Sequence, residues 1–361
     1  DIIGKAVFNY DFGSVTTESP VVKAAYASLK EAEHRSTFLL PYWNIPILGS
    51  GPYSIVPRQR EFAANLQLLN DKLDELVVQA RSLKKEEDLE ALEKRDYSTI
   101  EDPSMLRFLI DIRGGDCEDK QLRDDLMTLL IAGHETTGSL LTWTAFELAQ
   151  NKDEMHKIQK ELDDVLQGRA PTLADIKNLH HTRMALSEGL RLYPQPPILL
   201  RRVLTETELP RAQNGDQGLE NGMPIQAEGV KLNPGANIFI SVWNLHRNPL
   251  LWEDPDKFKP SRWLSKQVSQ GHPTWEGYSP KESGLYPNEV DSDFGYIPFG
   301  GGQRKCVGDQ FAMMEAVVIL SKVLQKYDLN LVGEPEDVGM ATGATIHTAN
   351  GLRMKLVARN L

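Results

Sequence analysis

The hydrophobic residues of the first half of the chain recur at helical spacing. Between Val21 and about Tyr193, apolar positions are mostly three or four residues apart, which is typical of helices that pack one face on a core. One clear run comprises Phe62, Leu66, Leu69, Leu73, Leu76 and Val77. The pattern predicts successive amphipathic helices.

The pattern changes after Pro194. Short alternating or β-branched runs follow, among them residues 236–242 (ANIFISV) and 344–356, with Pro and Gly between them. In the second run, Asn350-Gly351 separates two alternating segments, which predicts a type I′ β-hairpin. This half is expected to contain small sheets.

Three polar segments and one last helix complete the pattern. Residues 206–229 and 265–293 are rich in Gly and Pro and are expected to be surface insertions. Residues 84–102 are dense in charge, which is typical of a solvated helix end and loop. A long helix is predicted from about Gly308 to Tyr327.

No internal repeat and no separating linker is found, so we expect one domain over residues 1–361. Its first part, 1–193, is predicted to be helix-rich, and its second part, 194–361, to be mixed. The expected fold class is mainly α with small β-sheets (α+β).

Composition restricts the function. With 40% hydrophobic and 25% charged residues over 361 positions, the chain can bury a sizeable core. A net charge of -11 argues against nucleic-acid binding. Two cysteines cannot make a disulfide framework, a four-cysteine zinc site or a thiolate-held iron–sulfur cluster, and they indicate a reducing compartment.

No membrane span is predicted. The best apolar run, residues 126–143, is interrupted by the polar stretch 133–137. The chain starts at Asp1 without an initiator Met or a signal peptide, so we expect it to be part of a longer polypeptide.

A glycine-rich loop contains one of the two cysteines. Residues 298–308 read PFGGGQRKCVG, which fits neither a Walker phosphate loop nor a dinucleotide-binding turn. Cys306 stands where a helix begins, and a helix N-terminus stabilises negative charge, so the thiol is expected to have a lowered pKa. Such a thiolate suits a nucleophile or an axial metal ligand.

Two further motifs are ambiguous on their own. Residues 132–137 (AGHETT) place polar groups in an apolar helix, where a buried polar patch with Thr bonded to the preceding turn is the common outcome. Glu188 and Arg191 lie three residues apart on one helix face, a pattern that is frequent by chance.

Together these motifs resemble the cytochromes P-450. The spacing F-x-x-G-x-R-x-C-x-G from Phe299 to Gly308 is similar to the haem-thiolate loop of that family, and the order of the other motifs agrees with it. The resemblance implies that Cys306 binds the iron of haem b. It also implies that Phe299, Gly302, Arg304 and Gly308 surround the cofactor.

The resemblance assigns roles to the AGHETT segment. Glu135 would relay protons and Thr136 would hold dioxygen by its hydroxyl, while Gly133 would make room for it. His134 is interpreted as structural.

A structural network is also implied. Glu188, Arg191 and Arg262 would hold the cysteine loop and its supporting segment in place. In residues 258–263 (FKPSRW), Ser261 and Trp263 replace the family's more usual Glu and Phe. Further, a basic residue would meet a haem propionate, and in residues 196–202 (PPILLRR) Arg201 and Arg202 both remain candidates.

A closer resemblance is to the plastid carotenoid ring hydroxylases of plants and algae. It is carried by residues 1–12 (DIIGKAVFNYDF), 34–43 (HRSTFLLPYW), 304–312 (RKCVGDQFA) and 342–352 (TGATIHTANGL). Gly300 and Gln303 depart from the plant pattern. This departure leaves open that the chain is an algal or divergent relative with altered substrate preference. The family's amino-terminal part is expected to precede Asp1.

The resemblance implies the hydroxylation of a carotene ring with O2 and with electrons from NADPH through a reductase or a ferredoxin-type donor, which would dock near Lys305. It further implies a plastid location with peripheral membrane association. An apolar substrate requires an apolar site. The candidate lining residues are Leu130, Ala132, Ile198, Leu199, Met340, Ala341, Thr342 and Gly343.

Four other functions compete with this interpretation. A hydroxylase of the same family that acts on a fatty acid or another lipid stays an alternative. Rearrangement of a hydroperoxide is disfavoured by the acid–alcohol pair Glu135-Thr136. A non-haem di-iron hydroxylase needs clustered histidines, and only His180 and His181 are adjacent. A non-enzymatic haem carrier or sensor, or an inactive truncated haem-binding protein, stays open.

Overall fold

The structure is a computed structural model. It describes residues 1–49, 51–82, 102–113, 118–209, 230–272, 275, 277–280 and 284–359. Cys117 and nearly all of the charged segment 84–102 lie outside the described residues, as does the part of the first polar tract from 210 to 229. The chain divides into two compact units, residues 1–135 and 136–361. A single domain over residues 1–361 therefore stays a prediction.

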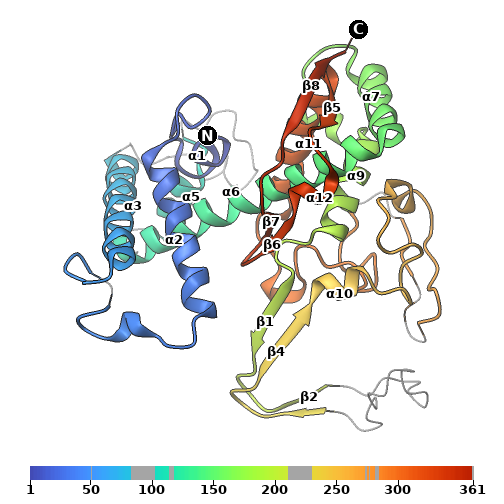
Figure 1. Ribbon diagram of the computed structural model, residues 1–361. Coiled ribbons are helices and arrows are strands. Elements are labelled where there is room, and N and C mark those ends of the chain that lie inside the picture. The colour runs from blue at the N-terminus through green and yellow to red at the C-terminus, as the bar shows by residue number, and fades with distance from the viewer. Residues whose placement is uncertain are drawn as a thin grey trace. The chain divides into compact units, whose positions relative to one another are not determined.

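Helices build the described part of the first unit (Figure 1). They are α1 (Ile2–Phe8), α2 (Pro20–Thr37), the 3-10 turn η1 (Tyr42–Asn44), α3 (Pro57–Ser82), α5 (Met105–Arg113) and the first turns of α6 (Asp119–Gln150). α2 packs along α3, and α1 packs on α5. α3 buries Leu69, Leu73, Leu76 and Val77, so the apolar face predicted from the sequence packs inward.

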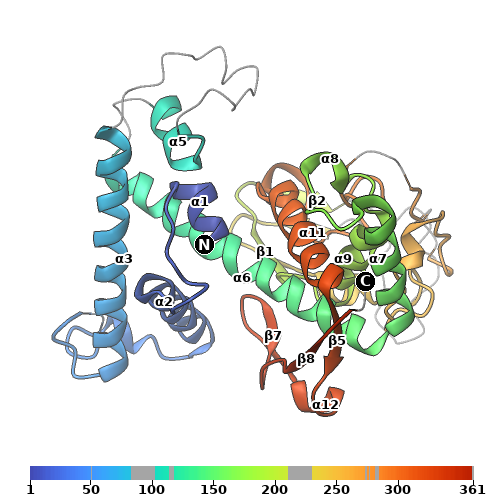
Figure 2. The same cartoon turned by 90° about the horizontal axis from the view of Figure 1, so that it is seen from above.

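The second unit begins with the rest of α6 and has its core around three helices. The helices and 3-10 turns that follow are α7 (Lys152–Leu166), α8 (Leu173–Ile176), α9 (His180–Leu192), α10 (Val242–His246), η4 (Pro260–Trp263), η5 (Gly302–Arg304), α11 (Asp309–Lys326) and α12 (Pro335–Val338). α7, α9 and α11 pack on one another (Figure 2). They bury Leu162, Leu186 and Leu320 with the aromatic rings of Trp252 and Tyr296.

The described strands form four antiparallel pairs, all in the second unit. β1 (Ile198–Arg202) pairs with β4 (Asn237–Ser241), β2 (Thr207–Leu209) with β3 (Val230–Leu232), β5 (Tyr327–Leu331) with β8 (Met354–Ala358), and β6 (Met340–Thr342) with β7 (Ile346–Thr348). The predicted class, mainly α with small β-sheets, is confirmed.

The predicted hairpin at Asn350-Gly351 is wrong. β7 and β8 flank this dipeptide but pair with different strands, so they do not form one hairpin. The turn lies one segment earlier, where the N–H of Gly343 donates to the carbonyl of Thr345 at 2.8 Å. Local turn propensity favoured one site, whereas the pairing of β8 with β5 after the long helix decided the register.

The second polar tract, residues 265–293, is not simply a surface insertion. Within its described positions Trp275, Tyr278 and Tyr286 are buried in the core of the second unit. The indole N–H of Trp275 donates to the carbonyl of Ser292 at 2.8 Å. The Gly- and Pro-rich composition suggested a surface loop, although three aromatic side chains of this tract pack in the core. In the described part of the chain, no helix is both long and apolar enough to span a membrane.

Candidate functional site

The glycine-rich loop closes on itself around Cys306. The N–H of Cys306 donates to the carbonyl of Phe299 at 2.9 Å, and the N–H of Gly300 donates to Ile297 at 3.0 Å. Gly300 and Gly302 have φ values of 74° and 67°, a left-handed conformation that favours glycine. These two glycines therefore shape the turn. This role explains their presence without phosphate binding, for which the sequence pattern is absent.

The thiol of Cys306 is exposed, and its environment differs from the prediction. Gly308 caps α11, and its N–H donates to the sulfur, which lowers the pKa of the thiol. The pKa of Cys306 is nevertheless raised, first because neighbouring atoms exclude part of the water around the sulfur and then because the Asp309 carboxylate repels a thiolate. The predicted lowering is wrong because Cys306 precedes the first turn of α11, where the effect of the helix N-terminus is concentrated.

Lys305 is held by two carboxylates beside the loop. Its ammonium lies 2.9 Å from Glu289 and 3.2 Å from Asp309, and these partners raise the pKa of Lys305 although loss of water opposes the rise. The hydroxyl of Tyr286 donates to Asp309 at 2.6 Å. The charge of Lys305 is thus neutralised locally, so this residue is a poor anchor for an acidic partner.

The donor set fits a haem rather than a bare metal ion. Among the described residues there is no group of three or more His, Cys, Asp or Glu side chains that could hold a metal. Cys306 offers one exposed sulfur in a loop that has a donor from Gly308. One thiolate is what an iron with four porphyrin nitrogens still needs.

Glu188 is the centre of a fully buried charged network. Arg191 donates to both carboxylate oxygens of Glu188, at 3.0 and 2.9 Å, and Arg262 donates to both at 2.9 and 3.1 Å. The backbone N–H of Lys259 adds a third donor at 3.0 Å. Burial alone would raise the pKa of Glu188, but the two guanidinium groups outweigh it and the pKa is lowered.

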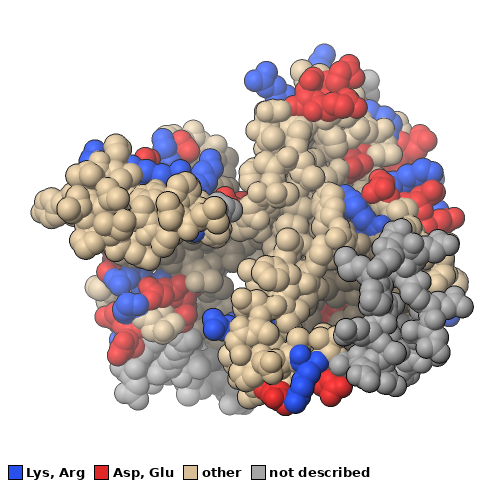
Figure 3. Space-filling model, turned by 60° about the horizontal axis from the view of Figure 1, so that its bottom comes forward, with Lys and Arg blue, Asp and Glu red and all other residues tan. Residues whose placement is uncertain are grey.

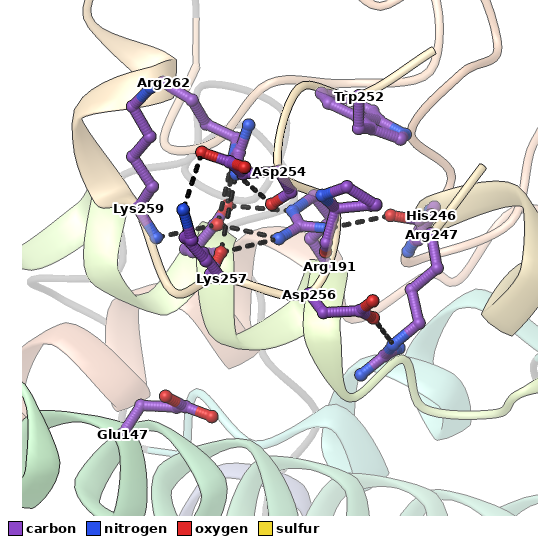
Figure 4. Close-up of polar contacts among 12 residues, drawn as sticks. Glu147, Arg191, His246, Arg247, Trp252, Asp254, Asp256, Lys257, Lys259 and Arg262 are labelled. Carbon is purple, nitrogen blue, oxygen red and sulfur yellow. Dashed lines mark hydrogen bonds and ion pairs between the residues drawn. The ribbon is translucent and has the colours of Figure 1, made fainter. Parts of the chain in front are cut away.

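The two arginines also hold the segment before η4 (Figure 4). Arg191 donates to the carbonyls of His246 at 2.8 Å, Pro255 at 2.6 Å and Lys257 at 3.1 Å. Arg262 donates to the carbonyl of Glu253 at 3.0 Å. The structure therefore brings Glu188, Arg191 and Arg262 together and ties α9 to the irregular segment that precedes η4.

Trp263 is a member of this network that sequence reasoning missed. Its indole N–H donates to Glu188 at 3.1 Å. A Phe, the residue more usual here in the resembled family, has no such donor. The departure from the family pattern was the available signal, because a buried indole N–H requires an acceptor.

The AGHETT segment lies within α6, which is continuous through it. Glu135 and Thr136 are half-buried. A Cβ at Gly133 would stand 2.5 Å from Ile3, so this glycine allows α1 to approach α6 closely. His134 bonds through Nδ1 to the hydroxyl of Tyr26 at 2.8 Å. A tight helix contact is thus one reason for the glycine that the motif alone did not indicate.

The candidate lining residues of α6 point to different sides. Leu130 is buried and, together with Glu135, lines a cavity in the first unit, whereas Ala132 is exposed and does not line it. Residues two positions apart in a helix differ by about 200° around its axis. A shared site for Leu130 and Ala132 therefore stays a prediction.

β1 presents its residues alternately. Leu199 faces the cysteine loop, because its Cδ1 would lie 3.9 Å from a Cβ at Gly300. Arg201 shares this face of the strand and is half-buried, and Arg202 is exposed on the other face with Ile198. The alternation separates the two arginines that the sequence left equivalent.

The other lining candidates belong to the β6–β7 hairpin. Met340, Ala341 and Thr342 form β6, and the turn begins at Gly343. The hairpin is fixed at Ile346, whose carbonyl accepts from the indole of Trp143 at 2.9 Å. These four positions stay candidates for contact with a substrate.

Comparison with known proteins agrees with this geometry. The chain is 51% identical to "Cytochrome P450 97B2, chloroplastic" of Glycine max, over 100% of this chain and 60% of the relative. It is 44% identical to "Protein LUTEIN DEFICIENT 5, chloroplastic" of Arabidopsis thaliana (99% and 53%). It is 42% identical to "Carotene epsilon-monooxygenase, chloroplastic" of the same plant (99% and 59%). The chain thus spans less than two thirds of each relative. The family model "Cytochrome P450" matches residues 1–350, and the chain belongs to the cytochrome P-450 family.

Proposed function

We propose that the full-length protein containing this chain is a plastid haem-thiolate monooxygenase that hydroxylates a ring carbon of a carotene. The exposed sulfur of Cys306, in a loop that two left-handed glycines shape, is the observation that carries the haem assignment. The names of two relatives, which concern lutein and a carotene, support the substrate class. When bound, the haem supplies the activation of O2.

The residues of the chain have separate tasks in this proposal. Cys306 would bind the iron, within a loop that includes Phe299, Gly302, Arg304 and Gly308. The Glu188 network would hold the segment that supports this loop. Arg201 would bond to a propionate, because it lies on the face of β1 that is turned toward the loop, whereas Arg202 lies on the other face.

Glu135 and Thr136 would handle protons and oxygen. Both are half-buried neighbours in α6. The carboxylate of Glu135 would take up and pass on protons, and the hydroxyl of Thr136 would bond to the oxygen that receives them. Removal of this hydroxyl should divert electrons from product to peroxide without loss of haem.

The electrons would come from NADPH through a reductase or a ferredoxin-type protein. The docking site for this donor is not assigned to Lys305, whose charge is already neutralised by Glu289 and Asp309.

Peripheral contact with a membrane is also proposed. Large areas of the face in Figure 3 carry neither acidic nor basic residues. In the segment between α2 and α3, several apolar or aromatic side chains are strongly exposed, among them Leu39 at 96%, Leu40 at 72% and Tyr53 at 95%. Exposed apolar side chains of this kind suit insertion into a lipid interface. Flotation of the full-length protein with vesicles of plastid lipid should weaken when Leu39 and Leu40 are both changed to Ser.

The haem assignment is tested with Cys306→Ser in the full-length protein. We expect the thiolate-type Soret band of the reduced carbon monoxide complex to disappear, because a hydroxyl is not a comparable ligand. Cys117→Ser, which changes the other cysteine, is the matched control and should keep the band. A band that survives Cys306→Ser would remove the assignment.

The substrate is tested by co-expression of the full-length protein with a redox partner in cells that accumulate carotenes, followed by analysis of the pigments. Hydroxylated carotenes are the expected products. Unmodified carotenes together with turnover of fatty acids would instead identify a lipid hydroxylase of the same family.

A further inference from the structure

A small cavity lies in the first unit beside α6. Its volume is about 30 Å³. It is lined by residues of α1, α2 and α6 and by the segment between α1 and α2, including Ile3, Ser14, Ala25 and Leu130. A water molecule needs roughly 10–15 Å³, so the cavity has room for water and is far too small for a carotene.

Most of the cavity wall is apolar, but five of its twelve lining residues carry polar side chains. Ser14 lines it, and its hydroxyl oxygen is buried without a hydrogen-bond partner in the described part of the chain. Tyr26, His134 and Glu135 also line it. A buried hydroxyl is nearly always bonded, either to protein or to ordered water. Water in the cavity would bond to Ser14 and find further partners among the other polar groups.

The cavity meets the face of α6 that carries Glu135 and not the face of Thr136. The lining residues of α6 are Leu130, Ile131, His134 and Glu135, which fall within an arc of about 140° at 100° per residue. Thr136 lies outside this arc, and it is not a lining residue. Glu135 therefore stands between the cavity and the next residue of the helix, which the proposed function assigns to oxygen.

We propose that this cavity is a water-filled proton inlet to Glu135 in which Tyr26 and His134 are positioning residues. The inference rests on the proposed function of Glu135 and Thr136. A cavity water gives one proton to the Glu135 carboxylate and takes one from the next water toward solvent. Solvent thus loses the proton that Glu135 gains, and no electron moves.

Tyr26 and His134 suit this task because they bond to water without trapping the proton. Burial lowers the pKa of His134, so the ring stays neutral. Burial, together with the charge of Glu135, raises the pKa of Tyr26, which keeps its hydroxyl proton. Their mutual bond at 2.8 Å fixes both rings at the cavity wall. The other charged side chain that lines the cavity is Asp1, whose carboxylate accepts from the N–H groups of Ser14 and Val15, both at 2.9 Å.

The first test is structural and does not depend on activity. A high-resolution crystal structure of the full-length protein should contain ordered water within hydrogen-bond distance of the Ser14 hydroxyl and of Tyr26 or His134. A dry cavity, or one filled by a side chain, would overturn the proposal.

The second test uses two variants of the full-length, haem-loaded protein. Tyr26→Phe removes the hydroxyl, and Ala25→Leu fills the cavity while it keeps every polar group. Each should lower product formed per electron pair about tenfold and change the solvent isotope effect, because Tyr26→Phe removes a bonding partner of the cavity water and Ala25→Leu displaces the water that would carry the proton. Tyr327→Phe, at a tyrosine of β5 that does not line the cavity, is the matched control.

The outcomes separate the two proposals. If the wild-type protein lacks the thiolate-type carbon monoxide band, the proposed function fails. The crystal structure then still shows whether the cavity contains ordered water. If both variants keep the band, the coupling and the solvent isotope effect of the wild type, the inlet is wrong while the monooxygenase stands. Should Tyr26→Phe fail to fold, Ala25→Leu and the water positions decide.

Discussion

Two polar clusters in this molecule are built in opposite ways. In the second unit, Glu188 is completely buried and accepts from Arg191, Arg262, Lys259 and Trp263. In the first unit, the half-buried His134 and the exposed Tyr26 bond to each other beside a cavity that also reaches Glu135. The first cluster contains two full positive charges against one negative charge. Among the described side chains of the cavity wall, the charged ones are the acidic Asp1 and Glu135, and no Lys or Arg is present.

The difference shows how the hydrogen-bond partners of a polar cluster decide whether it is rigid or can exchange protons. A buried carboxylate with this many donors is held in one geometry, since the loss of either arginine leaves charge uncompensated in a medium of low dielectric. A cluster that completes its bonds with water can exchange protons, because water can donate and accept in turn. The cluster of Glu188 is therefore suited to holding the surrounding segments in place, and the cluster of His134 to the transfer of protons.

The largest effect is expected from Arg191→Ala. This change leaves Glu188 with half of its compensating charge and leaves the carbonyls of His246 and Pro255 without their donor. The free energy of unfolding should fall by about 3–5 kcal/mol, and haem should not be incorporated. Urea unfolding and the haem content of the purified protein are the measurements. Lys120→Ala, which removes an exposed ion pair with Asp124, should cost about 0.5 kcal/mol or less.

Trp263→Phe isolates one donor of the same cluster. Loss of the indole N–H to the charged Glu188 should lower the free energy of unfolding by about 2 kcal/mol. Trp275→Phe removes a similar bond to the neutral carbonyl of Ser292 and should cost about 1 kcal/mol. Equal losses in the two variants would show that the charge of Glu188 does not strengthen the bond.

Gly189→Ala tests how closely α9 must approach α6 next to Glu188. A Cβ at position 189 would overlap the hydroxyl of Thr144, so we expect a loss of about 1–3 kcal/mol in the free energy of unfolding. Gly138→Ala is the matched change in a helix, at a position with no atom within 4 Å of the new Cβ. There the greater helix propensity of Ala should add about 0.5–1 kcal/mol. A neutral result at position 189 would contradict the close packing.

The smallest effect concerns Glu315 of α11, a carboxylate without the donors of Glu188. Its Oε2 is buried and has no hydrogen-bond partner among the described residues, and burial raises its pKa from 4.5 to about 7. Between these two values the folded state keeps a proton that the unfolded state has released, so stability falls as pH rises through this range.

Glu315→Gln should remove this decline and stabilise the protein at pH 8 by about 1–2 kcal/mol, after allowance for the exposed part of the side chain. Unfolding curves from pH 4 to 8 are the measurement. Glu336→Gln, at an exposed glutamate of α12, is expected to leave the pH dependence unchanged. A parallel shift in both variants would contradict the role of burial.

The sequence by itself determined the elements that depend on local pattern. The apolar period of residues 62–77 predicted the buried face of α3, and β-branched residues at 237–241 predicted β4. The spacing from Phe299 to Gly308 indicated the cysteine loop through its resemblance to the family, and one of its glycines, Gly302, has the left-handed φ that favours glycine. These features are encoded by residues close in the chain.

Tertiary structure decided what depends on distant neighbours. The pKa of Cys306 follows from Asp309 and from local exclusion of water, the register of β8 from its partner β5, and the environment of His134 from Tyr26, 108 positions earlier. Likewise, the donor that Trp263 gives to Glu188 joins residues 75 positions apart. Electrostatic and hydrogen-bond energies depend on distance in space, which a linear pattern does not contain, so only the folded chain could assign these partners.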